Sequence, residues 1–509
     1  MGHSVLSLLV PVAVIVMVAF TKRVVFSLLS GIILGAWLVS DSFWNMLKLV
    51  YAKLSAVFYS NTPAFALNTN SLYIFAFLVI LGILTQVISA SGASASFVLK
   101  ARKLVKSARQ SEFVALFAGL VIFIDDYFNA LIVGQVSKSL NDAHQSSRER
   151  LAYIIDSTSA PVCMLMPISS WGAYIVGVMQ NEGIENSFAL LLSSITSNYY
   201  AWFALVAVFL TILWQINLPA MARYKNIGVQ DLSPIQQEGS KAPVSLLLSS
   251  VAILISSTCA LIFYTGYVHA QSFNPLDILK NTQTSFSLFA GGLISLGITL
   301  ILAKKYLQAR ALIPLAIQGF KSMQGAILVL ILAWTIGPLI RDDLQTGVYL
   351  ASLIGHFQSA SVWLSMVLFV ISGFIAFSTG TSWGAFAIML PIGTSMSAGL
   401  GGDLVLAVAA ILSGAVYGDH ASPISDTTIL SATGAGCSIQ SHFLTQLPYA
   451  TLSALCALVA FITASLSFSK TLGFVVGLTL LTSLFYCFKR FFEYRQLKCA
   501  QDSCDVPKR

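Results

Sequence analysis

The chain is short of charged residues. Only 9% of its 509 residues are Asp, Glu, Lys or Arg, whereas 57% are hydrophobic, and the mean hydropathy is +0.82. A soluble protein of ordinary composition carries about 25% charged residues. So little charge cannot cover a water-exposed globule, so the composition predicts an all-α polytopic membrane protein.

Two kinds of motif are also missing. The sequence has no phosphate-binding loop of the Gly-x4-Gly-Lys-Ser/Thr type, which argues against an ATP-driven pump. Five of the seven cysteines lie in or beside apolar segments, where Cys behaves as a small hydrophobic residue. The remaining pair, Cys499 and Cys504, has no histidine partner and is a weak metal signal. We therefore expect no cofactor.

Long apolar runs account for most of the chain, and a bilayer core needs about 20 apolar residues per helix. The uninterrupted runs are Ser4–Phe20, Val24–Val39, Leu72–Ala90, Ala201–Ile216, Val244–Tyr264, Phe286–Leu302, Gln324–Ile340, Phe443–Leu466 and Thr471–Phe488. Two further spans, near Leu151–Met179 and Leu404–Gly436, are interrupted by polar residues and proline. Together they predict about 11 spans plus two hairpins. The first run is followed, not preceded, by Lys22 and Arg23, which indicates a retained helix and not a secretory signal.

The net charge of +8 follows the membrane topology and does not indicate a nucleic-acid site. With Lys22 and Arg23 placed in the cytoplasm, the predicted inside loops and tail hold 23 of the 28 basic residues. The predicted outside retains Lys48, Lys53, Lys280, Arg341 and Lys470. This distribution obeys the positive-inside rule. We expect a multi-pass protein of the bacterial cytoplasmic membrane, with its N-terminus outside and its C-terminus in the cytoplasm.

One apolar segment, Ser111–Gly134, has basic clusters on both sides, at Lys100–Arg109 and Lys138–Arg150. A re-entrant hairpin would keep both clusters inside, whereas a kinked crossing helix would leave one outside. The proposed tip, Phe123–Asn129, holds two carboxylates and one amide. Irregular backbone at membrane depth is tolerated where it lines a cavity or is buried in protein.

The second half of the chain repeats this design. An apolar run, Val362–Phe377, leads into the polar segment Ser378–Gly384 and then into Ala385–Ile392. The span after each hairpin contains a proline, Pro161 or Pro423, at the same distance from a following Gly-Ala pair. By the basic-loop pattern the two halves have opposite orientations, and inverted repeats with broken helices are typical of alternating-access transporters.

These features predict five parts. They are 1–71, N-terminal helices and an external segment; 72–216, the first inverted repeat; 217–323, a cytoplasmic linker and connecting helices; 324–466, the second inverted repeat; and 467–509, the C-terminal helix and tail. Each repeat is expected to hold a re-entrant hairpin and a broken transmembrane helix.

The predicted helix breaks have the chemistry of a cation site. They are Asp156–Pro161 and Gly418–Thr428, each with a proline that should open the helix. Opened helices expose carbonyl groups beside Ser, Thr and Asp oxygens, and hard cations prefer oxygen ligands. Desolvation disfavours an ionised carboxylate. One buried aspartate could then hold a proton or a sodium ion, which would couple the two.

The candidate ion-binding or proton-coupling residues are Asp125, Asp126, Asn129, Asp156, Ser157, Thr158, Thr379, Thr381, Ser382, Asp419, His420, Ser422, Ser425, Asp426 and Thr427. Sodium is expected at Asp126, Asp419 and Asp426. Adjacent aspartates on a helix point about 100° apart, so one of Asp125 and Asp126 faces the ion and the other caps a helix.

Three other roles stay open. Asp156 follows a basic cluster closely enough to be an interfacial N-cap. Asp419 and Asp426 share a face if helical turns continue around Pro423. His420 either titrates near neutral pH or only hydrogen-bonds the break.

The second break resembles the NhaC family of sodium/proton antiporters. The string Gly418-Asp-His-Ala-Ser-Pro-Ile-Ser-Asp-Thr-Thr428, with Thr381-Ser-Trp-Gly384 upstream, carries the resemblance. Asp419, Ser422, Pro423, Ser425, Asp426 and Thr427 match the family string. Membership implies two inverted repeats, a scaffold with a mobile (elevator-like) transport domain, often a homodimer, and exchange of Na+ for H+ without enzymatic activity.

Two other functions fit parts of the sequence. A sodium- or proton-coupled exchanger of a small organic anion or amino acid would need a basic residue in its site, and neither break contains Lys or Arg. An intramembrane aspartyl protease is suggested by the aspartates near Tyr127 and Tyr417, but it leaves the repeats and the Ser/Thr-rich breaks without a role.

Overall fold

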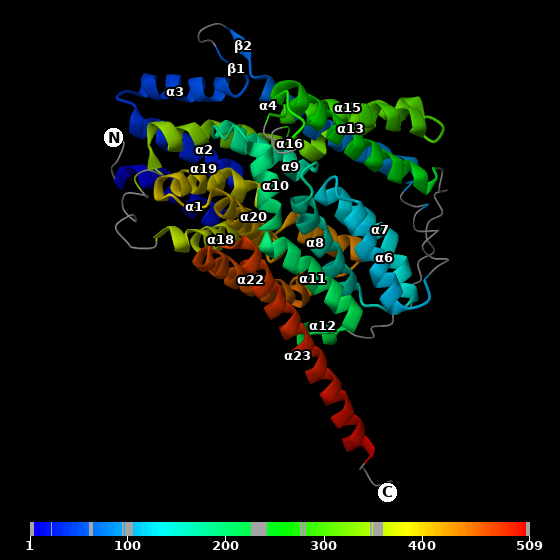
Figure 1. Ribbon diagram of the computed structural model, residues 1–509. Coiled ribbons are helices and arrows are strands. Elements are labelled where there is room, and N and C mark those ends of the chain that lie inside the picture. Colours follow the sequence, from blue (N-terminus) through cyan, green and yellow to red (C-terminus); the bar gives the residue numbers. More distant parts are fainter. Residues whose placement is uncertain are drawn as a thin grey trace.

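The computed structural model describes residues 5–21, 23–60, 65–93, 96, 105–224, 242–274, 278, 281–346, 349 and 360–504. Within these ranges the chain is almost entirely helical, as predicted. A short antiparallel pair, β1 (Tyr59–Ser60) and β2 (Ala66–Leu67), lies at one edge of the molecule (Figure 1). Several predicted inside-loop residues lie outside the described residues: Lys22, Lys100, Arg102, Lys103, Lys225, Lys241, Lys508 and Arg509.

The first half contains η1 (Val5–Leu8), α1 (Leu9–Thr21), α2 (Val24–Val39), α3 (Phe43–Ala56), α4 (Thr69–Ser91), α6 (Ala108–Val121), α7 (Asp126–Ala143), α8 (Arg148–Leu165), α9 (Ser170–Asn181), α10 (Ser187–Thr196), α11 (Tyr199–Trp214) and α12 (Pro219–Ala222). The second contains α13 (Val244–Ala270), α15 (Thr284–Ala303), η2 (Ala309–Ala311), α16 (Leu312–Pro338), the π-helix η3 (Leu339–Asp343), α18 (Ala360–Thr379), α19 (Ser382–Leu400), α20 (Leu404–His420), α21 (Asp426–Ala435), α22 (Ile439–Ser467) and α23 (Lys470–Cys504). Figure 1 shows α23 leaving the helical body toward the C-terminus.

Every apolar run predicted to span the membrane falls on a helix. Among the described residues, eight helices are long and apolar enough to cross a bilayer, and the number rises to ten if each bent helix pair is one span. The bent pairs are α8 with α9 and α10 with α11, each bent by 42°. The chain is therefore a multi-pass membrane protein.

Both predicted hairpins correspond to packed helix pairs with a non-helical break. Helices α6 and α7 pack together around the break 122–125, and α18 packs on α19 around Gly380 and Thr381. The first broken helix differs from the prediction, because α8 continues through Pro161 and ends at Leu165. Its break is 166–169, one turn later. The second break, 421–425, contains Pro423 as predicted.

Two glycine contacts join the first half of the chain to the second. Helix α4 crosses α16 where Gly82 meets Gly319, and a Cβ on Gly82 would overlap the Gly319 carbonyl oxygen. Helix α7 crosses α21 where a Cβ on Gly134 would lie 2.6 Å from the Cα of Gly434. Only glycine lets two helix backbones approach this closely.

A buried ion pair joins α6 and α8 to the end of α11. Arg150, near the start of α8, lies 2.7 Å from Glu112 of α6, measured from Nε to Oε1. The guanidinium also donates to the carbonyl oxygens of Ile216 (2.9 Å) and Thr211 (2.7 Å), at the end of α11. Both carbonyls lie at or just beyond the C-terminal end of α11, and each also accepts a second hydrogen bond, from the backbone N–H of Ile216 or from the hydroxyl of Tyr449. One side chain thus holds α6, α8 and α11 together.

A second ion pair joins α9 to η3. Glu182 follows α9, and its Oε2 accepts a hydrogen bond from Nη1 of Arg341 at 3.2 Å. Burial raises the pKa of the Glu182 carboxyl to about 7, although Arg341 acts in the opposite direction. The same nitrogen of Arg341 donates to the carbonyl oxygen of Asn181 at 2.9 Å.

Candidate functional site

The two neighbouring aspartates at the tip of the first hairpin make different contacts. Asp125 lies in the break before α7, and its Oδ2 accepts a hydrogen bond from Ser170 of α9 at 3.1 Å. Asp126 begins α7, and its Oδ1 is buried without a hydrogen-bond partner among the described residues, although the indole N–H of Trp171, likewise unpaired, lies close enough to interact with this carboxylate. The Oδ1 of Asn129, one turn further along α7, is also buried without a hydrogen-bond partner among the described residues. Buried polar atoms without partners are rare and call for an explanation.

The other end of the Asn129 side chain has a structural role. Its Nδ2 lies within hydrogen-bonding distance of the carbonyl oxygens of Gly119 (2.7 Å), Ile122 (2.7 Å) and Thr158 (2.9 Å). It therefore closes the open end of α6 and ties that end to α8. Thr158, also predicted in the site, donates its hydroxyl to the carbonyl oxygen of Ile154 in its own helix.

Asp419 lies in the last turn of α20 and is 3% exposed. Its Oδ2 accepts hydrogen bonds from the backbone N–H (3.1 Å) and the hydroxyl (2.8 Å) of Ser382, the first residue of α19. Its Oδ1 accepts from Ser425 at 2.5 Å. The carboxylate thus sits at the positive N-terminal end of α19, where a negative charge is stabilised. It thus links two further predicted site residues, Ser382 at the start of α19 and Ser425 in the break before α21.

Asp426 does not share a face with Asp419, which corrects that expectation. The break residues 421–425 are not helical, so Asp419 ends one helix and Asp426 begins the next. Asp419 is buried, whereas Asp426 is exposed and accepts a hydrogen bond from Tyr127 of α7 at 3.1 Å. The carboxylates of Asp125 and Asp419 are nevertheless close enough to interact electrostatically with that of Asp126.

The remaining residues of the second tip join it to the second break. Ser422 donates to the carbonyl oxygen of Phe377, near the end of α18, at 2.7 Å. Gly380 has a φ of +69°, and a Cβ there would lie 2.6 Å from the carbonyl oxygen of Ile424. Thr379 donates to the carbonyl oxygen of Ile375 in its own helix. Thr381 precedes α19 as its N-cap without a capping side-chain bond.

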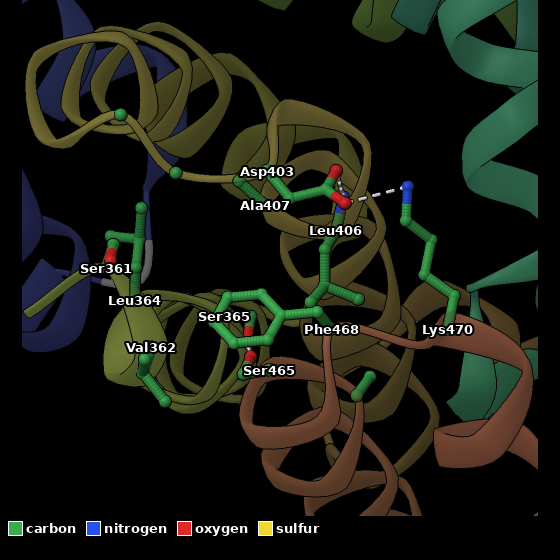
Figure 2. A pocket seen from close by; sticks show the side chains of 13 residues that line it. Ser361, Val362, Leu364, Ser365, Asp403, Leu406, Ala407, Ser465, Phe468 and Lys470 are labelled. Atoms are coloured by element: carbon green, nitrogen blue, oxygen red, sulfur yellow. Dashed lines mark hydrogen bonds and ion pairs between the residues drawn. The ribbon is translucent and has the colours of Figure 1, made fainter. Parts of the chain in front are cut away.

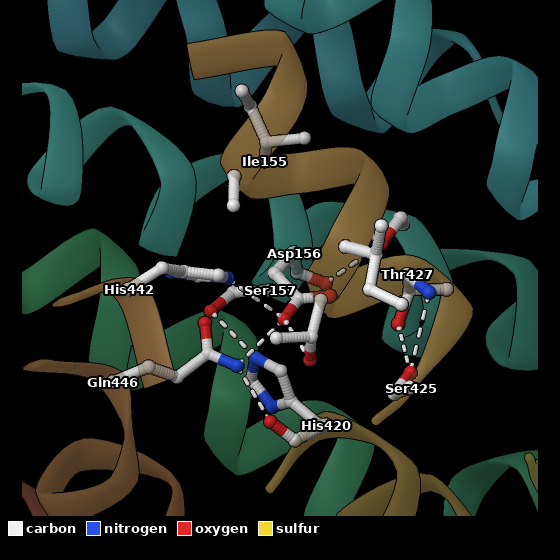
Figure 3. A network of polar contacts seen from close by, with 12 residues as sticks. Ile155, Asp156, Ser157, His420, Ser425, Thr427, His442 and Gln446 are labelled. Carbon is white, nitrogen blue, oxygen red and sulfur yellow. Dashed lines mark hydrogen bonds and ion pairs between the residues drawn. The ribbon is translucent and has the colours of Figure 1, made fainter. Parts of the chain in front are cut away.

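Asp156 is part of a separate buried network (Figure 3). Its Oδ2 accepts hydrogen bonds from Gln446 (2.6 Å) and Thr428 (3.3 Å) and lies 3.2 Å from Nε2 of His442. Its Oδ1 has no hydrogen-bond partner in the described part of the chain. The N-cap interpretation is wrong, because Ser147 caps α8 and Asp156 lies fully buried in the middle of the helix.

His420 joins that network to α11. Its Nδ1 lies 2.6 Å from the hydroxyl of Tyr200, its Nε2 lies 3.2 Å from the hydroxyl of Ser157, and its backbone oxygen accepts from Gln446. Thr427 remains near Ser425, with 3.0 Å between the two hydroxyl oxygens.

Sequence reasoning missed several members of these clusters: Ser170, Tyr200, His442 and Gln446. Two of them could have been found from the sequence. His442 and Gln446 stand four residues apart at the start of an apolar run, which places both polar side chains on the same face of one helix. A second overlooked signal is the Ser-Trp-Gly-Ala segment at the start of both α9 and α19. In the structure the two tryptophans, Trp171 and Trp383, meet with 5.7 Å between ring centroids.

A cavity of about 610 Å³ lies over the two tips. It is lined by Arg23, Val25, Phe26, Leu29, Asp125, Tyr127, Ser322, Met323, Gly325, Val329, Thr379, Gly380, Thr381, Trp383, Ile424 and Asp426. The exposed residue Asp426 therefore belongs to the lining of this cavity, whereas the buried Asp126 and Asp419 do not. Arg23 also belongs to the lining, although it lies about 100 residues before the first tip in the sequence.

A second cavity, of about 310 Å³, is elsewhere, between α18, α20, α22 and α23 (Figure 2). Its charged residues, Asp403 and Lys470, pair with each other at 2.8 Å. None of the predicted site residues lines it. It is therefore not the candidate ion site.

Comparison with known proteins identifies the family. A sequence profile described as the Na+/H+ antiporter family matches residues 162–466. The chain belongs to the Na+/H+ antiporter family. This confirms the NhaC-type resemblance, and it makes the protein a membrane transporter and not an enzyme.

Relatives of the antiporter family differ in how much they share with this chain. An uncharacterized protein of Haemophilus influenzae is 35% identical over 515 residues, covering 96% of both chains. An uncharacterized Na(+)/H(+) antiporter of the same organism is 30% identical over 128 residues, 25% of this chain and 26% of its own. The Malate-2H(+)/Na(+)-lactate antiporter of Bacillus subtilis is 33% identical over 129 residues, which cover 25% of this chain and 26% of that protein.

Among solved structures, MtrF of Neisseria gonorrhoeae, described as illuminating a class of antimetabolite efflux pumps, has a TM-score of 0.50. It is 12% identical to this antiporter-family chain, with 83% of this chain and 84% of MtrF covered. The likeness concerns the fold alone.

Proposed function

We propose that this protein exchanges Na+ for H+ at the carboxylates between its two helix tips. The observation that carries the proposal is the pair of buried oxygens without partners, Oδ1 of Asp126 and Oδ1 of Asn129, one turn apart on α7. A cation that accepted both oxygens as ligands would remove the cost of leaving them unsatisfied. Asp419, close enough to affect Asp126 electrostatically, adds the negative charge that a dehydrated cation requires.

One carboxylate serves both ions in this proposal. Asp125, Asp126 and Asp419 repel one another when ionised, and burial adds a desolvation cost to each charge. Without a cation the cluster therefore retains a proton. Sodium displaces that proton when it binds. The site therefore carries either a proton or a sodium ion across the membrane, but not both together. The exchange needs no separate proton path.

Access alternates by movement of one part of the molecule against the rest. The hairpins and broken helices of residues 72–216 and 324–466 form two inverted repeats and carry the site. The remaining helices form a scaffold, and two copies of the chain associate as a dimer. The cavity over the site reaches Arg23, which the basic-loop pattern puts at the cytoplasmic end.

Everted membrane vesicles with a pH-sensitive dye test the proposal. Sodium added to vesicles that hold the protein, acidified by respiration, should release protons and restore the dye signal. Asp126→Asn should reduce this release at least about tenfold, while Glu185→Gln, at an exposed carboxylate in the loop between α9 and α10, should retain it. Wild-type vesicles that show no cation-dependent proton release would refute the proposal.

A further inference from the structure

Asp156 is a buried carboxylate that lies apart from the proposed exchange site. It stands in the middle of α8 and is 0% exposed. No Lys or Arg of the described residues pairs with it, and its one ion-pair contact there is with His442, whose ring is positive only when protonated. A buried carboxylate without a positive partner is strongly disfavoured. Asp156 therefore needs either a proton or a cation.

The contacts of Asp156 fit its ionised form (Figure 3). Three donors converge on its Oδ2: Nε2 of Gln446 at 2.6 Å, Nε2 of His442 at 3.2 Å and the hydroxyl of Thr428 at 3.3 Å. A neutral carbonyl oxygen has two lone pairs, whereas an ionised carboxylate attracts further donors and binds them more strongly. The orientation of the Gln446 amide is fixed, because its Nε2 also donates to the backbone oxygen of His420. The positive charge must therefore lie elsewhere than on this oxygen.

His442 is poorly placed to supply that charge. Its Nε2 faces an acceptor, so in the neutral ring this nitrogen carries the proton and Nδ1 carries a lone pair. A second proton, on Nδ1, would create a buried charged N–H, and Nδ1 has no hydrogen-bond partner among the described residues. An unpaired donor on a charged group costs more than one on a neutral group. A bound cation is therefore the better source of the charge.

Three side-chain oxygens around this carboxylate are buried and have no hydrogen-bond partner in the described part of the chain: Oδ1 of Asp156, Oε1 of Gln446 and Oγ of Ser431. Ser431 lies one turn after Thr428 on α21, on the helix face that contacts Asp156. A proton would satisfy one of these oxygens, whereas a cation accepts lone pairs from several at once. Water would also pair with them, but it brings no charge.

We propose that Asp156, Gln446 and Ser431 bind a monovalent alkali cation, sodium or potassium, between α8, α21 and α22. The three helices supply a carboxylate, an amide and a hydroxyl oxygen, which are ligands that hard cations prefer. One carboxylate balances one positive charge, so a divalent ion would remain uncompensated. The site is separate from the proposed exchange site, whose unpartnered oxygens belong to α7, and it does not depend on it. Its ion stabilises the junction of α8 with two helices from the second half of the chain.

Equilibrium binding of radioactive ions to the purified full chain tests the proposal. The probes are sodium and rubidium, the latter as a substitute for potassium, each with choline as the other cation. The Asp126→Asn variant, which lacks the carboxylate of the exchange site, should still bind one ion per chain. The double variant Asp126→Asn, Asp156→Asn should bind none. The probe that binds more tightly identifies the preferred cation.

A pair of serine variants assigns the contact without changing the charge. Added to Asp126→Asn, Ser431→Ala should raise the half-saturating concentration of the bound probe about three- to tenfold, because it removes one neutral ligand. Ser453→Ala is the matched control, since Ser453 is equally buried but donates to the carbonyl oxygen of Tyr449 in its own helix at 3.0 Å. It should bind the ion like its parent. Ser431→Ala gives a result even if Asp156→Asn does not fold.

Three outcomes would overturn the inference. They are an Asp126→Asn variant that binds neither probe, which would leave water as the partner of these oxygens; an ion that remains in the double variant; and equal affinities in the two serine variants. The exchange site is judged by a different comparison. Wild type should bind one sodium ion more than Asp126→Asn, and equal numbers would count against the exchange site alone.

Discussion

At the scale of single residues, the neighbouring aspartates of the first tip have different surroundings. Asp125 accepts a hydrogen bond from Ser170, whereas Asp126 has a buried oxygen without a partner. We predict that Asp126→Asn reduces sodium-dependent proton release at least about tenfold, because the amide cannot exchange a proton for a cation. Asp125→Asn should cause a clearly smaller loss. Dye-recovery assays on vesicles with matched protein amounts measure both, and equal, mild losses would make the pair structural.

The two aspartates of the second break should also be separable. Asp419 is buried and fully hydrogen-bonded, whereas Asp426 is exposed to the cavity. We predict that Asp419→Asn lowers the maximal exchange rate severely, while Asp426→Asn mainly raises the half-saturating sodium concentration, because it removes negative charge from the approach. Tyr127→Phe is the control, because it removes the hydrogen bond to Asp426 but no charge. It should raise the half-saturating sodium concentration less than Asp426→Asn does. Normal exchange kinetics in both aspartate variants would exclude this break from the ion site.

The sequence identifies those site residues whose role is visible in the neighbouring residues, and misses those whose role depends on contacts with distant segments. Asp419, Ser382 and Ser425 stand out because polar groups within apolar runs are costly, and the structure brings these three together. The partners His442 and Gln446 were missed because their role depends on contact with a helix almost 300 residues earlier in the chain. A single sequence carries no record of such a contact.

At the scale of elements, the first hairpin predicts a labelling pattern. Ser107 precedes α6 and Ala143 ends α7, and both are exposed. If the hairpin re-enters the cytoplasm, single cysteines at these positions in a cysteine-free background should resist an impermeant maleimide in intact cells. Both should react in everted vesicles. Labelling of one position from outside would indicate a crossing helix instead.

The junction of α9 with η3 predicts a pH-dependent contribution to stability. The pKa of Glu182 rises from an ordinary 4.5 to about 7, so the folded state holds this proton more tightly than the unfolded state does. The contribution of this carboxyl to stability is therefore largest below about pH 4.5 and is lost as the pH rises through about 7. We predict that the apparent melting temperature of Glu182→Gln falls less between about pH 5 and about pH 8 than that of the wild type.

The exposed carboxylate of Glu185 supplies the matched control for that measurement. Glu185→Gln should keep the pH dependence of the wild type, since the removed group is not buried. Parallel curves for Glu182→Gln and wild type would show that another group causes the effect.

Element boundaries were less predictable than the elements. Apolar runs specify helices because a bilayer leaves no other way to pair the backbone of a single segment. Pro161 did not open α8 where expected, although proline removes one backbone hydrogen bond. Residues 150–165 of α8 are buried throughout, so packing on every side supports the helix across this loss.

At the scale of the whole molecule, the proposed mechanism predicts competition between the two ions. If one carboxylate cluster binds either a proton or sodium, the apparent sodium affinity should fall as the pH drops, approaching about tenfold per pH unit. The maximal rate at saturating sodium should change much less. Measuring exchange against sodium concentration at several pH values tests this. A half-saturating concentration that does not change with pH would exclude the shared site.

The composition of the site cavity could not be predicted from local patterns. It combines Arg23 with residues of both tips and of α16, which follow Arg23 by about 100 to about 400 positions in the sequence. The positive-inside rule explained Arg23 as a topology signal. The structure shows that the same residue also lines the cavity.

The glycine crossing of α7 with α21 has a consequence for biosynthesis. The ribosome makes the 300 residues between Gly134 and Gly434 at about 5–20 per second, so α7 waits roughly 15–60 seconds for its partner. During that time the glycine surface of α7 and the carboxylates at its start are in the membrane without the helices that cover them. A nascent chain that stops before α21 therefore lacks one of the helices that the proposed ion site requires.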